Sequence, residues 1–184
     1  MNEQLRAELL EMERADRAKR AELVERGELH KFGYHPEMEE VHRRHNARMH
    51  DIISAHGWPG KSLVGEDGCR AAGFIVQHAI LDPELQRLCV GLLTEAVASG
   101  EAEGFMLALL TDRVLIEEGQ LQIYGTQYTG ASGGGVEPLP IAGLETVDDR
   151  RRAVGLPPLA DNTPRLNSQH AQELAKANQG SKGD

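Results

Sequence analysis

The chain has 184 residues, enough for one domain with a sizeable hydrophobic core. Its 20 Lys and Arg residues against 29 Asp and Glu residues give a formal net charge of −9. This balance argues against nucleic acid or an anionic membrane as the main partner, because phosphate groups are bound by clustered positive charge.

Neither a membrane segment nor a secretion signal is expected. No apolar run approaches the roughly 20 residues that span a bilayer, and residues 1–20 are charged from the start. The two cysteines, Cys69 and Cys89, match no metal or disulfide spacing. We therefore expect a cytoplasmic protein whose thiols stay reduced.

Residues 3–26 are predicted to form the first helix, because Leu5, Leu9 and Met12 recur on one face among charged residues. Asp16 lies on the same stripe, four residues after Met12. Its carboxylate is either solvated or directed inward. In the second case it needs a cation or hydrogen-bond donors to offset its desolvation.

Three further helices are expected in the N-terminal half. Pro36 begins a helix over about 36–56, which ends at the Gly57–Gly60 turn that contains Trp58. Residues 67–81 are apolar nearly all round, as is typical of a central helix. Asp82 then caps a helix that runs to about Ser99.

The pattern changes after residue 104. Residues 105–111 are continuously apolar and fit either a helix or a buried strand. Val114–Ile116, a turn at 117–120 and Leu121–Tyr128 are typical of a β-hairpin. A glycine-rich surface loop at 130–135 and a short helix at 145–154 follow.

These elements predict an α+β fold dominated by helices, with four N-terminal helices packed against a β-hairpin and a short C-terminal helix. We expect a single globular domain over residues 1–160. Residues 161–184 contain few large apolar residues and are expected to form a flexible tail.

Six of the eight histidines lie between residues 30 and 56. On a helix, His42 and His45 share a face and have the i,i+3 spacing of two zinc ligands. No nearby motif supplies the third and fourth ligands that such a site needs. The alternative is that these histidines are solvated or pack between helices.

His78 differs from them because it lies in an apolar helix, after Gln77 and four residues before Asp82. Burial beside a carboxylate can place an imidazole pKa near neutrality, as a general acid or base requires. The alternative is a core histidine bonded to a backbone carbonyl, with Asp82 serving only as a helix cap.

A second polar group lies in the predicted hairpin. Gln122, Tyr124 and Thr126 project from one face of a strand and offer donors and acceptors that could orient a polar ligand, although solvent-facing strands are often similar. Asp112 and Arg113 form an ion pair, or Arg113 presents its guanidinium to an anionic ligand.

Many short motifs occur in a recognisable order, and together they resemble a bacterial family, domain of unknown function 6624, over about residues 3–160. The motifs are Gly57-Trp58-Pro59, Leu63-Val64-Gly65, Ala71-Ala72, Gln77-His78-Ala79, Asp82, Gln86, Leu110-Thr111-Asp112-Arg113, Gln122-Ile123-Tyr124-Gly125-Thr126-Gln127, Val147-Asp148, Arg151-Arg152 and Gly155-Leu156. The resemblance implies no reaction. It implies that several polar residues match recurring positions of the family: Asp16, Asn46, Gln77, His78, Asp112, Arg113, Gln122, Tyr124 and Gln127.

Three functional hypotheses follow. The first is a cofactor-independent enzyme that hydrolyses, eliminates or cyclises a small polar or peptide-like molecule. The second is a binding module in which the same groups form a structural hydrogen-bond network. The third is a metal protein that uses His42 and His45.

The first hypothesis assigns roles to ten residues. The predicted catalytic residues are His78, Asp112 and Tyr124, and the predicted substrate-binding residues are Gln77, Arg113, Gln122, Gln127, Trp58, Asp16 and Asn46.

Overall fold

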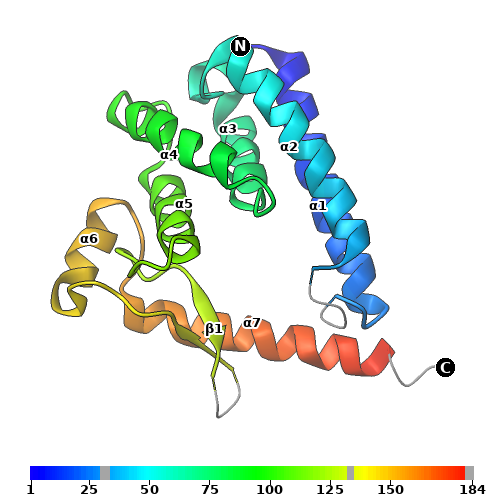
Figure 1. The fold of residues 1–184 in the computed structure, drawn as a ribbon, viewed down its shortest axis with the longest axis vertical. Coiled ribbons are helices and arrows are strands. Elements are labelled where there is room, and N and C mark those ends of the chain that lie inside the picture. Colours follow the sequence, from blue (N-terminus) through cyan, green and yellow to red (C-terminus); the bar gives the residue numbers. More distant parts are fainter. Residues whose placement is uncertain (30–33, 132–134, 181–184) are drawn as a thin grey trace. The chain divides into compact units, whose positions relative to one another are not determined.

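The computed structural model describes residues 1–29, 34–131 and 135–180, without the side chains of 169–170, 173–174 and 176–180. The described residues form seven α-helices, one 3-10 helix and a two-stranded antiparallel sheet (Figure 1), which confirms the helix-dominated α+β class. The elements in chain order are α1 (Glu3–Glu25), α2 (Pro36–His56), α3 (Lys61–Gln77), α4 (Pro83–Ala98), α5 (Gly104–Glu117), β1 (Tyr128–Gly130), β2 (Val136–Pro138), η1 (Leu144–Thr146), α6 (Val147–Ala153) and α7 (Leu159–Gly180).

The chain divides into two compact units. Unit 1 comprises Met1–Ala102 together with residues from Lys176 onward, and unit 2 comprises Glu103–Ala175. The single domain over 1–160 stays a prediction. Across the described part of the chain, no helix combines the length and the apolar character needed to cross a membrane.

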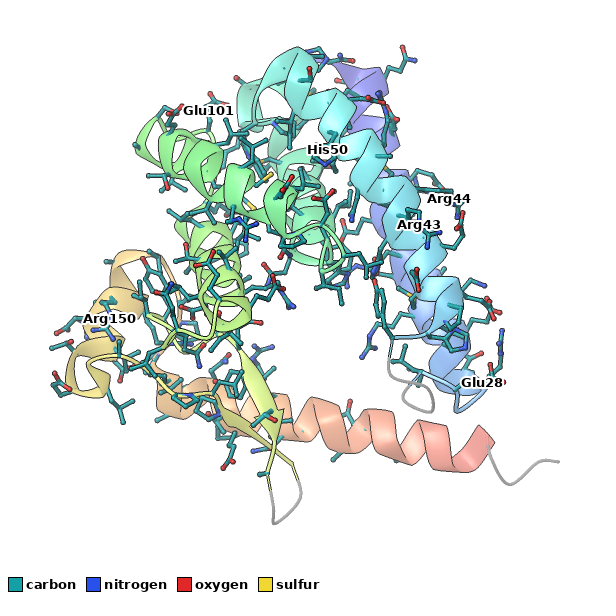
Figure 2. All side chains as sticks on the ribbon, in the orientation of Figure 1. Glu28, Arg43, Arg44, His50, Glu101 and Arg150 are labelled. Carbon is teal, nitrogen blue, oxygen red and sulfur yellow. The ribbon has the colours of Figure 1, made fainter. Side chains whose placement is uncertain are left out.

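In unit 1, α1 packs against α2 and α3, α2 packs against α3, and α3 packs against α4. The core forms where the apolar stripes of these helices meet, with Leu9, Met49 and Val64 fully buried. The predicted bounds of α2 are confirmed, because Pro36 starts the helix and Gly57, at φ 68°, ends it. The exposed Arg43 and Arg44 extend from the opposite face of α2 (Figure 2).

The bounds predicted for the third helix, 67–81, are wrong. α3 begins at Lys61, is interrupted at Gly65 (φ 75°) and ends at Gln77. The apolar pattern misleads here because Ala79 remains fully buried after the helix has ended. His78 is therefore the C-cap residue of α3, and its backbone N–H donates to the carbonyl oxygens of Phe74 and Ile75.

The predicted strand at Val114–Ile116 is wrong, because this segment belongs to α5, a fifth N-terminal helix. Residues 121–127 form an irregular segment with one isolated bridge between Gln122 and Ile141. The side chain of Asp112 accepts hydrogen bonds from the backbone N–H groups that would otherwise donate to a neighbouring strand. The hairpin lies further along the chain, where β1 pairs with β2.

The C-terminal part contains more helix than the sequence predicted. η1 and α6 lie where a helix at 145–154 was predicted, and α7 spans Leu159–Gly180. The flexibility expected from residue 161 onward stays a prediction. Residues 132–134 of the predicted glycine-rich loop and 181–184 of the predicted tail lie outside the described residues.

Candidate functional site

Asp16 is the centre of a polar cluster inside unit 1. Its side chain lies on the buried face of α1, and the residue is only 1% exposed. His42 on α2 donates a hydrogen bond from Nε2 to Oδ2 at 2.6 Å, and His78 donates from Nδ1 to the same oxygen at 3.1 Å. Asp16 is therefore directed inward, with the donors that such a carboxylate needs.

His78 lies at the edge of this cluster, with its side chain 29% exposed. Its Nδ1 is occupied by Asp16, whereas Nε2 has no hydrogen-bond partner among the residues that the structure describes. The Phe74 ring supports the imidazole at a centroid distance of 4.2 Å, and the Arg17 guanidinium covers Phe74. One ring nitrogen is thus held in place while the other remains available.

Both ring nitrogens of His42 form hydrogen bonds. Nε2 donates to Asp16, and Nδ1 accepts from the hydroxyl of Tyr34. Burial raises the pKa of Tyr34, and the charge of Asp16 raises it further, so the hydroxyl stays protonated. The hydrogen bonds therefore run continuously from Tyr34 through His42 and Asp16 to His78.

The charge state of Asp16 is set by two opposing effects. Burial alone would raise the pKa of this carboxyl, because a low-dielectric interior disfavours the charged form. The hydrogen bonds from His42 and His78 outweigh that effect and hold the pKa well below its usual range. The carboxylate is accordingly ionised throughout the physiological range.

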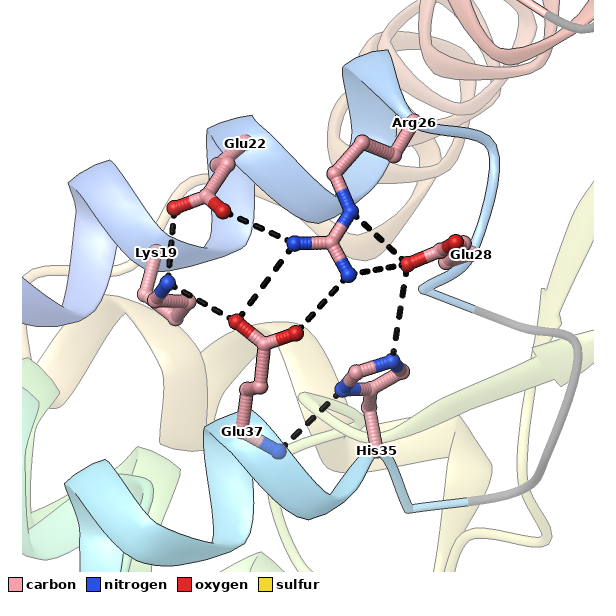
Figure 3. A network of polar contacts seen from close by, with 6 residues as sticks. All are labelled: Lys19, Glu22, Arg26, Glu28, His35 and Glu37. Carbon is pink, nitrogen blue, oxygen red and sulfur yellow. Dashed lines mark hydrogen bonds and ion pairs between the residues drawn. The ribbon is translucent and has the colours of Figure 1, made fainter.

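The loop before α2 presents Tyr34, and a network of ion pairs ties this loop to α1 (Figure 3). Arg26 binds Glu37 at 2.8 Å and also pairs with Glu28, while Lys19 binds Glu37 at 2.9 Å. Each exposed pair contributes little by itself. Together they join the end of α1 to the start of α2.

Among the residues that the structure describes, two groups of side chains have the composition of a metal site. The ligand atoms of Asp16, His42 and His78 lie within 4.8 Å of one another, and so do those of Glu28, His35 and Glu37. A metal ion at the first group would have to replace both hydrogen bonds to Asp16. His45, the other half of the predicted metal pair, belongs to neither group.

Asp82 is the N-cap of α4 and not the partner of His78. Its Oδ1 accepts from the backbone N–H of Leu85 at 3.0 Å, and its Oδ2 lies 2.8 Å from Nε2 of His50. Asp82 therefore caps α4 and also contacts His50, so it does not serve only as a helix cap. The carboxylate beside His78 comes from α1 instead.

In unit 2, Asp112 shapes the loop that follows α5. It is fully buried and accepts hydrogen bonds from the backbone N–H groups of Ile123, Tyr124 and Thr126, at 2.7–2.9 Å, and from the hydroxyl of Thr126. Its oxygens are thus directed at the loop and not at Arg113, so the predicted ion pair is not formed.

Gln122 and Gln127 hold the next part of the same loop. The side chain of Gln122, fully buried, donates to the carbonyl oxygens of Gln127 and Leu139 and accepts from the N–H of Gln127. The side chain of Gln127 donates to the carbonyl oxygen of Leu109 at 3.4 Å. All these contacts join backbone segments of unit 2.

The remaining predicted residues have separate environments. The backbone of Tyr124 donates to Asp112 and accepts from the buried Arg151. In the described part of the chain, Nε of Arg113 and Nε1 of Trp58 are buried without a hydrogen-bond partner. The backbone carbonyl oxygen of Gln77 accepts a hydrogen bond from the side chain of Gln86.

Unit 1 therefore brings together Asp16, His42 and His78, and unit 2 brings together Asp112, Gln122 and Gln127. Sequence reasoning did not select Tyr34 or Phe74. The position of Asp16 on an apolar stripe was the available signal for the cluster. Nothing local in the sequence marks the tyrosine.

Comparison with curated proteins found no match, and comparison with solved structures found none either. The model of DUF6624, described as a family of unknown function, matches residues 3–173. Because this match covers most of the chain, the protein belongs to the DUF6624 family.

Proposed function

We propose that the protein is an enzyme in which His78 acts as general acid and base on a small polar or peptide-like molecule. This proposal rests on the different hydrogen-bond environments of the two ring nitrogens of His78. Nδ1 donates to a buried carboxylate, while Nε2 has no partner in the described structure and belongs to a partly exposed side chain.

The proposed chemistry is a proton transfer at Nε2. In the neutral ring, the proton on Nδ1 is held by Asp16, which leaves the lone pair of Nε2 free to accept a proton from water or from the substrate. The ionised Asp16 stabilises the resulting imidazolium, which then returns the proton to a leaving group. This cycle serves hydrolysis, elimination or cyclisation and requires no cofactor.

Asp16 acts in this proposal as a positioning residue. His42 occupies its Oδ2 at 2.6 Å, which holds the carboxylate in place and favours its ionised form. Asp112, Gln122 and Gln127 are proposed to build the loop of unit 2 and not to react. That assignment follows the second sequence hypothesis, a structural hydrogen-bond network, for this part of the chain.

The proposal places the protein in the cytoplasm. Both cysteines, Cys69 and Cys89, are buried free thiols, as is usual in a reducing compartment. The net charge of −9 favours a small molecule or peptide over nucleic acid or a membrane surface as the partner.

The test compares wild type with His78→Asn, using a panel of small amides, esters and lactams and expressing rates per folded molecule. Any turnover found should fall by about 100-fold or more, because general acid–base catalysis contributes about that much. His50→Asn is the matched control, since His50 also contacts a carboxylate, Asp82, but lies outside the cluster. Equal rates in wild type and His78→Asn would refute the proposal.

Asp16→Asn tests the positioning role separately. It should lower kcat with little change in KM, because the substrate contacts remain while the orientation of His78 is lost. A purely structural role would reduce only the amount of folded protein. A variant with normal kcat per folded molecule would therefore remove Asp16 from the mechanism.

A further inference from the structure

Two adjacent residues of α2 bury polar atoms that have no partner. Asn46 is 6% exposed and His45 is 8% exposed, and neither Oδ1 of Asn46 nor Nδ1 of His45 has a hydrogen bond within the described ranges. Buried polar atoms in folded proteins are nearly always paired, so two neighbouring exceptions point to a partner such as a water molecule, an ion or a bound ligand group.

Asn46 lies level with the chain segment that follows α3. It stands one helical turn from His42 and one turn from His50, between them along α2. The ring of His42 lies 5.5 Å from that of His78, and Nε2 of His50 contacts Asp82 at 2.8 Å (Figure 2 labels His50). The face of α2 that carries Asn46 therefore runs along residues 78–82, beside the proposed reacting group.

Within the described residues, no donor reaches the buried Oδ1 of Asn46. Burial lowers the pKa of His45, so its ring is neutral and keeps an acceptor nitrogen. Asp16, whose charge acts on His45, remains ionised. An amide oxygen, a neutral imidazole and a nearby carboxylate attract a group that brings N–H donors and positive charge, and they repel an anion.

We propose that Asn46, together with His45, forms a subsite beside His78 that binds an N–H donor group of the substrate, as in a carboxamide or a protonated amine. The subsite rests on the proposed function, which makes His78 the reacting group. It narrows the substrate class to molecules that carry such a group close to the bond that reacts.

The first test needs no ligand. Replacing an unpartnered buried polar group by an apolar one of similar size removes a desolvation cost, so Asn46→Leu should raise the Tm by about 2–4 °C. Asn162→Leu is the matched control, because Asn162 is also buried but donates to Tyr128 and accepts from Arg165, and it should lower the Tm. A lower Tm for Asn46→Leu would show a structural partner and overturn the proposal.

The second test uses the wild-type protein, so it does not depend on how a variant folds. Acetamide and methylammonium are titrated separately while the side-chain signals of Asn46 and His45 are followed by NMR, with acetate as the anionic control. Saturating shifts with acetamide, with methylammonium or with both support the subsite and identify the donor class. No saturation with either probe, or equal shifts with acetate, would overturn it.

The two proposals fail in distinguishable ways. If only the subsite is wrong, the probes leave the NMR signals of Asn46 unchanged, while His78→Asn still abolishes turnover. If only the acid–base function is wrong, the probes still shift Asn46 and His45, and turnover survives in His78→Asn.

Discussion

Oδ2 of Asp16 lies 3.1 Å from Nδ1 of His78, although 62 positions separate the two residues in the chain. The contact joins α1 to the C-cap of α3, two elements that pack directly on one another. It places a buried negative charge behind a partly exposed imidazole. The stability and the proposed chemistry of unit 1 both depend on this pair.

Asp16→Asn should destabilise the protein at pH 7 by about 3 kcal/mol, because two histidine N–H groups lose a charged acceptor. The pKa of Asp16 is lowered in the folded state, so its contribution is fully present above the unfolded carboxyl pKa of about 4 and is lost as the pH falls below it. Urea unfolding of wild type and variant should therefore show a difference that shrinks on acidification.

The control for this prediction is Asp149→Asn, which changes an exposed carboxylate of α6. Its effect should stay within about 0.5 kcal/mol at every pH. A difference between wild type and Asp16→Asn that grows as the pH falls would contradict the assigned charge state.

Asp112→Ala should destabilise unit 2 by about 4 kcal/mol, because three backbone N–H groups and the Thr126 hydroxyl lose their acceptor. Hydrogen exchange at Ile123, Tyr124 and Thr126 should accelerate before exchange elsewhere. Asp112→Asn keeps one acceptor oxygen and should give a smaller loss. Unchanged protection of these three amides in Asp112→Ala would contradict the structural role.

Arg113→Met should stabilise the protein by about 1 kcal/mol when no ligand is present. The side chain is partly buried, burial lowers its pKa more than the charge of Glu117 raises it, and Nε has no partner in the described residues. Methionine retains the length of the side chain without the charge. Thermal unfolding measures the effect, and a clear loss of stability would mean that Arg113 is paired in solution.

The helix boundaries of unit 1 were predictable where a local signal marked them. Pro36 and Gly57 define α2, and Asp82 with Pro83 defines the start of α4, because capping depends on residues that are close in sequence. Leu121–Tyr128 was predicted as strand because alternation was its only visible pattern, and within it only Tyr128 lies in a strand. The backbone N–H groups of this segment donate to Asp112 instead of to a neighbouring strand, and Asp112 lies on the preceding helix.

The sequence was enough to select Asp16 and His78 as candidate site residues, but not to show that they contact each other. Asp16 and His78 were both selected from the sequence, yet Asp82 was the carboxylate considered for His78 because it is only four residues away. Packing of α1 on α3 supplies Asp16 instead, and α2 adds His42 with Tyr34 before it. Such contacts depend on the tertiary arrangement, which no short-range pattern encodes.

The tautomer of His78 tests the central claim most directly. Long-range ¹H–¹⁵N NMR of the neutral ring should show the proton on Nδ1 and a bare Nε2, and Asp16→Asn should abolish this preference. His50, which contacts Asp82 through Nε2, should show the opposite tautomer in the same spectrum. A neutral His78 with its proton on Nε2 would contradict the account, because Asp16 would then not hold the ring and Nε2 would have no free lone pair.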